Sequence, residues 1–258
     1  MTVSFRNIIC ALVAFVFFSC EEEELDGSSC LITGLNLSTG MSTVYEYEDG
    51  ILSRVIRENP GFFEEEESEI YENIYTIQSG QIVRTDYYTN GRKNNNYYRT
   101  YEYDHLGRLS KIYEYYYETF QYVEYYEFIY DESDKVTRIE NFYFNPGQDP
   151  QNFGHYQLTW ENGNVVKVVE YLKSASDRKG SSNHRINDIN ETGFLEWNYT
   201  YDNKTNPVQY MGYIQFNLPF LSKNNLLKVD HHNFGEFHQH SEYTYQYNSL
   251  GIPSQYHI

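Results

Sequence analysis

Residues 101–112 read Tyr-Glu-Tyr-Asp-His-Leu-Gly-Arg-Leu-Ser-Lys-Ile, and this stretch decides the fold. Tyr101 and Tyr103 are separated by one residue, so in a strand both rings lie on one face and Glu102 lies on the other. The Asp-to-Gly segment that follows is typical of a tight turn, because these residues tolerate the positive φ that hairpin turns need. The aliphatic residues after it supply a return strand, so the stretch predicts a β-hairpin.

The same pattern recurs along the chain. Clear copies begin at Tyr45, Phe128 and Leu158, and weaker copies at Tyr75, Tyr199 and Tyr245. The residue before the turn falls at positions 47, 77, 103, 130 and 160, which gives spacings of 30, 26, 27 and 30 residues. A unit of this length holds two strands and a connection. Because one hairpin cannot bury its own apolar face, the repeat predicts an all-β, antiparallel meander of stacked hairpins.

The amino terminus has the features of a secretory signal peptide. One positive charge, Arg6, precedes an unbroken apolar run of eleven residues at 8–18, and the small residue Ser19 follows. As a helix, eleven residues rise about 16 Å, well short of the roughly 30 Å hydrocarbon core of a bilayer. Residues 1–19 are therefore predicted to be removed and not to span a membrane.

The end of this segment, at residues 17–20, reads Phe-Phe-Ser-Cys and resembles a bacterial lipobox. It departs from the lipobox pattern in its two Phe residues, where Leu and a small aliphatic residue are commoner. The resemblance implies that Cys20 is acylated and becomes the new amino terminus, the only membrane contact of the mature chain. The alternative is an ordinary cleaved signal followed by an incidental cysteine.

Residues 20–39 are interpreted as the lipidated cysteine and an acidic tether. Four consecutive carboxylates, Glu21 to Glu24, stay solvated and extended. The run also resembles the acidic tag that marks surface lipoproteins in one large group of Gram-negative bacteria. The expected location is the outer membrane, lipid-anchored and exposed at the cell surface, with residues 40–258 forming the hairpin domain.

The charge of the chain limits its partners. The full sequence carries a formal net charge of −18, and loss of residues 1–19, whose only charged side chain is Arg6, changes this to −19. Nucleic acid and anionic membrane surfaces are disfavoured, because binding to phosphates needs Lys and Arg. Neither a Gly-x-Ser-x-Gly nucleophile elbow nor a Gly-rich phosphate loop occurs in the sequence, and no cofactor is predicted.

The repeated units resemble YD repeats, the tyrosine-aspartate hairpins of Rhs-type shell proteins, and residues 101–109 match best. With the lipobox, the segments Tyr201-Asp-Asn-Lys-Thr-Asn-Pro207 and Leu221-Ser-Lys-Asn-Asn225 make roughly residues 40–258 similar to a lipoprotein domain family described as having a porin-like fold. That resemblance implies a many-stranded antiparallel meander, curled or closed like a barrel. It implies no activity.

Charged residues alternate along the predicted strands, as at Glu46, Glu102, Lys111, Arg138 and Lys167. A strand that faces lipid keeps every second residue apolar across a band of about 25 Å. The sheet is therefore predicted to be soluble, with tyrosines filling its inner face.

Residues 113–130 are aromatic at positions of both parities, and this predicts either a second packing surface or a binding platform. The candidate binding residues are Tyr115, Tyr117, Tyr122, Tyr126 and Trp197. Aromatic rings that are exposed stack on sugars or on protein partners. The expected partner is a glycan or an envelope protein.

Four histidines lie close together near the carboxyl terminus. If residues 234–235 form a turn, His232 faces His238 and Asp230 faces His240, so one sheet face would carry three imidazoles and a carboxylate. These are suitable ligands for zinc or a similar metal. The alternative is a solvated histidine strand that binds no metal.

The sequence favours a surface lipoprotein that binds an external ligand or partner without catalysis. A structural scaffold that packs against outer-membrane partners through residues 113–130 is the alternative. A carboxylate-based glycoside hydrolase comes third, because carboxylates are numerous but no spacing singles out a pair.

Overall fold

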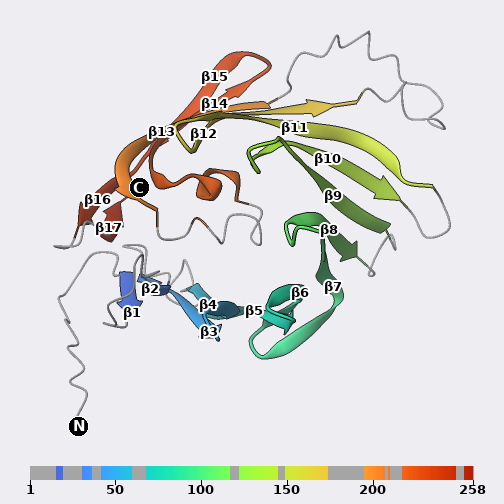
Figure 1. Cartoon of the computed structure of the whole chain (residues 1–258). Helices are drawn as coiled ribbons and strands as arrows, with labels where there is room; N and C mark the ends of the chain where they lie inside the picture. The colour runs from blue at the N-terminus through green and yellow to red at the C-terminus, as the bar shows by residue number, and fades with distance from the viewer. Residues whose placement is uncertain are drawn as a thin grey trace.

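The computed structural model describes residues 16–19, 31–36, 42–59, 68–116, 122–144, 149–173, 195–206, 209, 217–247 and 253–257. In this part of the chain, fifteen strands form one sheet in chain order, and two further strands form a small second sheet (Figure 1). Within the same residues, no helix has the length and hydropathy needed to cross a bilayer.

The first eight strands are β1 (Val16–Ser19), β2 (Leu31–Asn36), β3 (Ser42–Glu48), β4 (Ile51–Asn59), β5 (Glu69–Gln78), β6 (Gln81–Thr89), β7 (Arg92–Tyr103) and β8 (Leu109–Tyr116). The large sheet continues with β9 (Tyr122–Tyr130), β10 (Val136–Phe144), β11 (Gln151–Glu161), β12 (Asn164–Leu172), β13 (Leu195–Thr205), β14 (Asn224–Asn233) and β15 (Glu236–Glu242). A short 3-10 helix, η1 (Leu218–Leu221), precedes β14, and β16 (Thr244–Tyr247) pairs with β17 (Pro253–His257).

Each strand of the large sheet pairs antiparallel with its neighbours in sequence, which confirms the predicted all-β antiparallel meander. The sheet is strongly curled, with η1 inside the curve (Figure 1). In the described residues β1 and β15 do not pair with each other, so the sheet is not closed. The β16–β17 hairpin lies at the carboxyl-terminal end of the curl, where β17 lies beside β1.

The predicted signal peptide lies only partly within the described residues. Its last four residues form β1, which pairs with β2. Cys20 and the acidic residues Glu21 to Glu24 lie outside the described residues. Cleavage before Cys20 would remove β1 and leave β2 as the edge of the sheet. Because Cys20 lies outside the described residues, cleavage and lipidation stay predictions.

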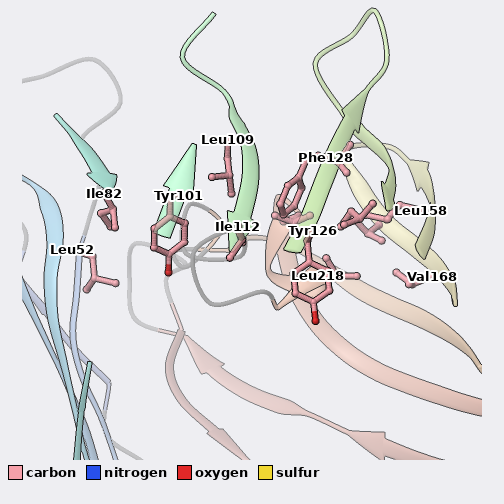
Figure 2. Packing of buried hydrophobic residues seen from close by; sticks show 14 of the residues in the cluster. Leu52, Ile82, Tyr101, Leu109, Ile112, Tyr126, Phe128, Leu158, Val168 and Leu218 are labelled. Carbon is pink, nitrogen blue, oxygen red and sulfur yellow. The ribbon is translucent and has the colours of Figure 1, made fainter. Parts of the chain in front are cut away.

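The core is built from two rows of buried side chains on one face of the sheet, called here the inner face. Each return strand contributes two side chains three positions apart, as in Leu109 with Ile112 (Figure 2) and in Val136 with Ile139, all at most 6% exposed. Such a spacing puts both on one face only if an extra residue lies between them, and a bulge next to the turn supplies it. Leu218 and Leu221 of η1 complete the core from inside the curve.

In several of the hairpins, an aromatic side chain just before the turn ties the hairpin to the preceding one. The Tyr103 hydroxyl donates to the backbone oxygen of Ile82 at 2.8 Å, and the Tyr130 hydroxyl donates to that of Leu109 at 2.8 Å. The equivalent donor in the next unit is Trp160 Nε1, 2.7 Å from the Val136 oxygen. The repeated aromatic residue is thus explained by a bond between repeats, beyond its apolar packing.

The turns follow the chemistry that the sequence predicts. Five described hairpins have positive φ at both central residues, as a type I′ turn requires, and in each the second residue is Gly. In the longer turn after Tyr103, Asp104 Oδ1 accepts the backbone N–H groups of Leu106 and Arg108, both at 2.9 Å. Asp131 accepts the corresponding groups of Ser133 and Lys135.

Phe234 is the exception among these turns, with φ of 49°. A bulky residue is strained in this region, whereas Asn adopts it readily. We expect Phe234→Asn to raise the free energy of unfolding by about 0.5–1 kcal/mol, measured by chemical denaturation. The reciprocal change Asp49→Phe, at φ of 50°, should lower it by a similar amount. Equal stability of both variants and the parent would contradict this account.

Candidate functional site

The inner face carries a polar group beside the apolar core. On each of five adjacent strands, β8 to β12, one polar side chain lies two positions from a core residue. These side chains are called here the inner acidic cluster: Glu114, Glu124, Asn141, Tyr156 and Glu170. Period-two alternation puts these side chains on the same face as the core. The register agrees, because Glu114 lies opposite Glu124 and Tyr156 lies opposite Glu170.

Glu114 is the structural member of the cluster. Its side chain is 6% exposed, forms an ion pair with Arg99 and accepts a hydrogen bond from the Tyr116 hydroxyl at 2.6 Å. Arg99 Nε also donates to the Tyr97 hydroxyl at 3.1 Å, and the Tyr97 ring lies 4.6 Å from Tyr87. Two carboxylates directly opposite each other are destabilising, and Arg99 offsets the charge of one of them.

Glu124 and Glu170 are held by neutral donors. Glu124 Oε1 accepts hydrogen bonds from the Tyr126 hydroxyl at 2.9 Å and from Asn141 Nδ2 at 3.0 Å. Glu170 accepts one from Tyr156. Among the described residues, no Lys or Arg forms an ion pair with Glu124 or Glu170. Burial, together with the charge of Glu124, raises the pKa of the Glu170 carboxyl, against the opposing effect of the Tyr156 hydrogen bond.

Asn141 has an unused acceptor in the same place. The residue is 7% exposed, and its Oδ1 atom has no hydrogen-bond donor within the described part of the chain. Its partner across the ladder to β11 is Gly154, which has no side chain to offer one. A Cβ at Gly154 would lie 2.1 Å from the Tyr171 backbone oxygen, so only glycine fits there.

The raised pKa of Glu170 gives a stability prediction. A carboxyl whose folded-state pKa is raised binds its proton more tightly in the folded state, so stability falls as the pH rises through the window above the ordinary pKa of 4.5. We expect Glu170→Gln to raise the melting temperature by about 1–3 °C at pH 7, since water partly screens this incompletely buried group. The gain should disappear near pH 4, below the ordinary pKa. A variant that melts below the parent at pH 7 would contradict the prediction.

The opposite, outer face carries a row of aromatic rings across β7 to β10, called here the outer aromatic strip. The strip consists of Tyr98, Tyr113, Tyr115, Tyr125 and Phe142. Tyr98 stacks on Tyr115 at 4.5 Å, and Tyr125 stacks on Phe142 at 4.7 Å with an interplanar angle of 5°. Cations flank the strip, with the Arg84 guanidinium 3.9 Å from the Tyr98 ring centroid.

The predicted binding residues do not share one surface. Tyr115 belongs to the outer aromatic strip, whereas Tyr126 is 9% exposed and lies in the core on the inner face. Trp197 is half-buried against the core and stacks on His231 at 5.4 Å. Tyr117 lies outside the described residues, and Tyr122 lies in β9 with its side chain outside them.

The predicted facing of the histidines is partly wrong. Asp230 lies opposite His240, as expected, but Phe237 and not His238 lies opposite His232. A bulge between His231 and His232 is the reason, and it turns the His238 ring toward His231, at 5.4 Å.

The bulge therefore moves His238 away from His232, while Asp230 and His240 stay opposite each other. Among the described residues, no three His, Cys, Asp or Glu side chains are arranged to hold a metal ion. Phe237, which takes the place opposite His232, is 58% exposed.

The inner acidic cluster was not predicted from the sequence. A usable signal existed in the repeat. Ile112, Ile139 and Val168 are the second core residues of their return strands, and each is followed two positions later by a polar side chain of the cluster. The abundance of carboxylates elsewhere in the sequence obscured this pattern.

No protein-family model matches the sequence, and no curated protein matches it. Among solved structures, the chain is similar to a porin-like protein from Bacteroides uniformis, with a TM-score of 0.53 and 10% sequence identity, over 94% of this chain and 87% of that one. At this identity the likeness concerns the fold alone.

Two toxin structures also match, with TM-scores too low to establish a shared fold. A TcdB2-TccC3 structure matches with a TM-score of 0.33 and 15% identity, over 83% of this chain and 9% of that one. The Photorhabdus luminescens Tc holotoxin pore matches with a TM-score of 0.33 and 13% identity, over 84% and 9%.

Proposed function

We propose that this protein is a lipid-anchored protein of the bacterial outer membrane that binds an external ligand on the inner face of its sheet, without catalysis. The observation that carries the binding role is the inner acidic cluster, in which two carboxylates lie on the core-bearing face without a cationic partner among the described residues. The envelope location rests on the lipobox-like sequence at Cys20, and the likeness in fold to a porin-like protein agrees with it.

A purely structural role explains the cluster poorly. Glu124 and Glu170 repel each other, and this repulsion contributes to the raised pKa of Glu170. Groups that work against the stability of the fold concentrate at functional sites. Glu124, Tyr156 and Glu170 are each only partly buried, so a ligand can reach them.

Hydrolysis of a glycoside is the less favoured use of the same carboxylates. It needs two carboxyl groups that both touch the substrate. Of the three carboxyl groups in the cluster, Glu114 is buried and engaged by Arg99, so only Glu124 and Glu170 are left for that role. Release of reducing ends from a glycan panel by the parent, and not by Glu124→Gln, would replace the binding proposal with an enzymatic one.

The outer aromatic strip supports a second candidate function, a scaffold that packs against outer-membrane partners. Its rings form a continuous row over four strands, in which neighbouring rings are stacked or tilted against each other. Under this alternative, Tyr115→Ser should release a co-purified envelope complex and leave ligand binding unchanged.

The binding role is tested by screening the full chain on glycan and envelope-protein arrays. Glu124→Gln should lose the signal, and Glu127→Gln, on the outer face of the same strand, should keep it. An empty screen, or equal loss in both variants, would reject the inner face as the binding surface.

The anchor is tested separately by cell fractionation. Parent protein should sediment with the outer membrane, and Cys20→Ser should appear in the soluble fraction. Alanine at all four positions from Glu21 to Glu24 should remove the sensitivity of intact cells to protease shaving. Membrane association of the Cys20→Ser protein would exclude a lipid anchor at this residue.

A further inference from the structure

We infer that the inner acidic cluster binds a primary ammonium group, carried by a small amine or by a lysine side chain. This inference rests on the proposed function, since it names the ligand of the same face.

The hydrogen-bonding groups of the cluster are unbalanced. The donors that reach Glu124 and Glu170 are hydroxyls of Tyr126 and Tyr156 and the amide of Asn141, all of them neutral. Each carboxylate has two oxygens and about four acceptor sites, so these donors leave acceptor capacity unused. Arg99, which lies beside the cluster, is engaged by Glu114. What the cluster lacks is therefore a positively charged donor.

Asn141 is an independent observation that points to the same ligand. Its side chain is directed at Glu124 through Nδ2, yet its Oδ1 atom has no donor among the described residues. A buried acceptor without a partner costs free energy comparable to a lost hydrogen bond, and such groups are rare in native proteins. A ligand N–H group that bonds both Glu124 and Asn141 would remove this cost.

An ammonium fits these acceptors better than the other ligands that carboxylates bind. It has three donors and no acceptor, whereas a sugar hydroxyl also needs donors, and the tyrosine hydroxyls of the cluster already donate to its carboxylates. The described residues contain no group of three His, Cys, Asp or Glu side chains fit for a metal ion.

The test is isothermal titration calorimetry on the full chain in detergent at low ionic strength. The probes are 1,5-diaminopentane, as a free amine, and Nα-acetyl-lysine methylamide, as a lysine side chain, with 1-pentanol as the neutral control. We expect at least one amine to bind and the alcohol not to bind. Glu170→Gln and Glu124→Gln should each weaken the amine about tenfold or more, because each removes a charged acceptor.

The matched control is Glu127→Gln, which removes the same charge from the outer face of β9 and should leave the dissociation constant within about twofold. Circular dichroism spectra establish that each variant is folded. Since Glu170→Gln is expected to stabilise the free protein, its loss of binding cannot be attributed to unfolding.

Three results would overturn the inference. These are equal binding of amine and alcohol, unchanged amine affinity in both cluster variants, and displacement of the amine by calcium at equal concentration. If a ligand without an amine binds the inner face and Glu124→Gln abolishes that binding, the proposed function stands and the ammonium inference fails. If neither the amines nor the arrays show binding at the inner face, both fail.

Discussion

Replacing Arg99 with methionine is expected to lower the free energy of unfolding by about 3–5 kcal/mol, because it breaks a buried ion pair. The Arg99 and Glu114 side chains are 18% and 6% exposed. Removing the guanidinium leaves the Glu114 carboxylate buried on the inner face and directly opposite Glu124, so two like charges remain without a cation. The measurement is urea denaturation followed by circular dichroism at pH 7.

Two controls separate this effect from the loss of side-chain packing. The double variant Arg99→Met/Glu114→Met replaces both charges with apolar groups of similar size, and it should recover most of the lost stability. Lys167→Met breaks an ion pair with Glu196 on the outer face, where the side chains are 38% and 33% exposed, and should cost about 1 kcal/mol or less. If Arg99→Met costs no more than Lys167→Met, the buried pair is not a special feature of the inner face.

The meander was predictable because it depends on local patterns. Alternating aromatic residues define the strands, and Asp-Gly or Asn-Gly pairs, such as Asp49-Gly50, have the positive φ that the turn needs. Antiparallel order then follows from hairpin turns that are too short for a crossover. The curl was predicted only through family resemblance, and its openness depends on pairing between distant strands, which no local pattern specifies.

The candidate site was harder to predict because bulges change which residues share a face. A simple two-residue period puts His238 with His232, but one extra residue in β15 moves it beside His231. A bulge next to the hairpin turn likewise allows two core residues that are three positions apart, such as Val136 and Ile139, to lie on the same face. The inner acidic cluster becomes visible only when the register of five strands is known.

Ile139→Ala is expected to lower the free energy of unfolding by about 2–5 kcal/mol, because the side chain is fully buried and its removal leaves a cavity. Ile129→Ala, at a site that is 42% exposed on the neighbouring strand, should cost well under half as much. Both are measured by thermal and urea denaturation. Similar losses of stability in the two variants would mean that the rows of buried core residues are not the main source of stability.

The same position tests how the core supports the cluster. Ile139 lies opposite Tyr156 and two residues before Asn141, so its side chain holds the part of the inner face where we place the ligand. Ile139→Val should cost only about 0.5–1.5 kcal/mol and leave the protein folded. We expect this milder change to weaken amine binding less than Glu170→Gln, because it alters packing beneath the cluster and keeps every acceptor. Amine binding that follows stability across Ile139→Val, Ile139→Ala and Glu170→Gln would instead mean that the cluster acts through the fold and not through its charges.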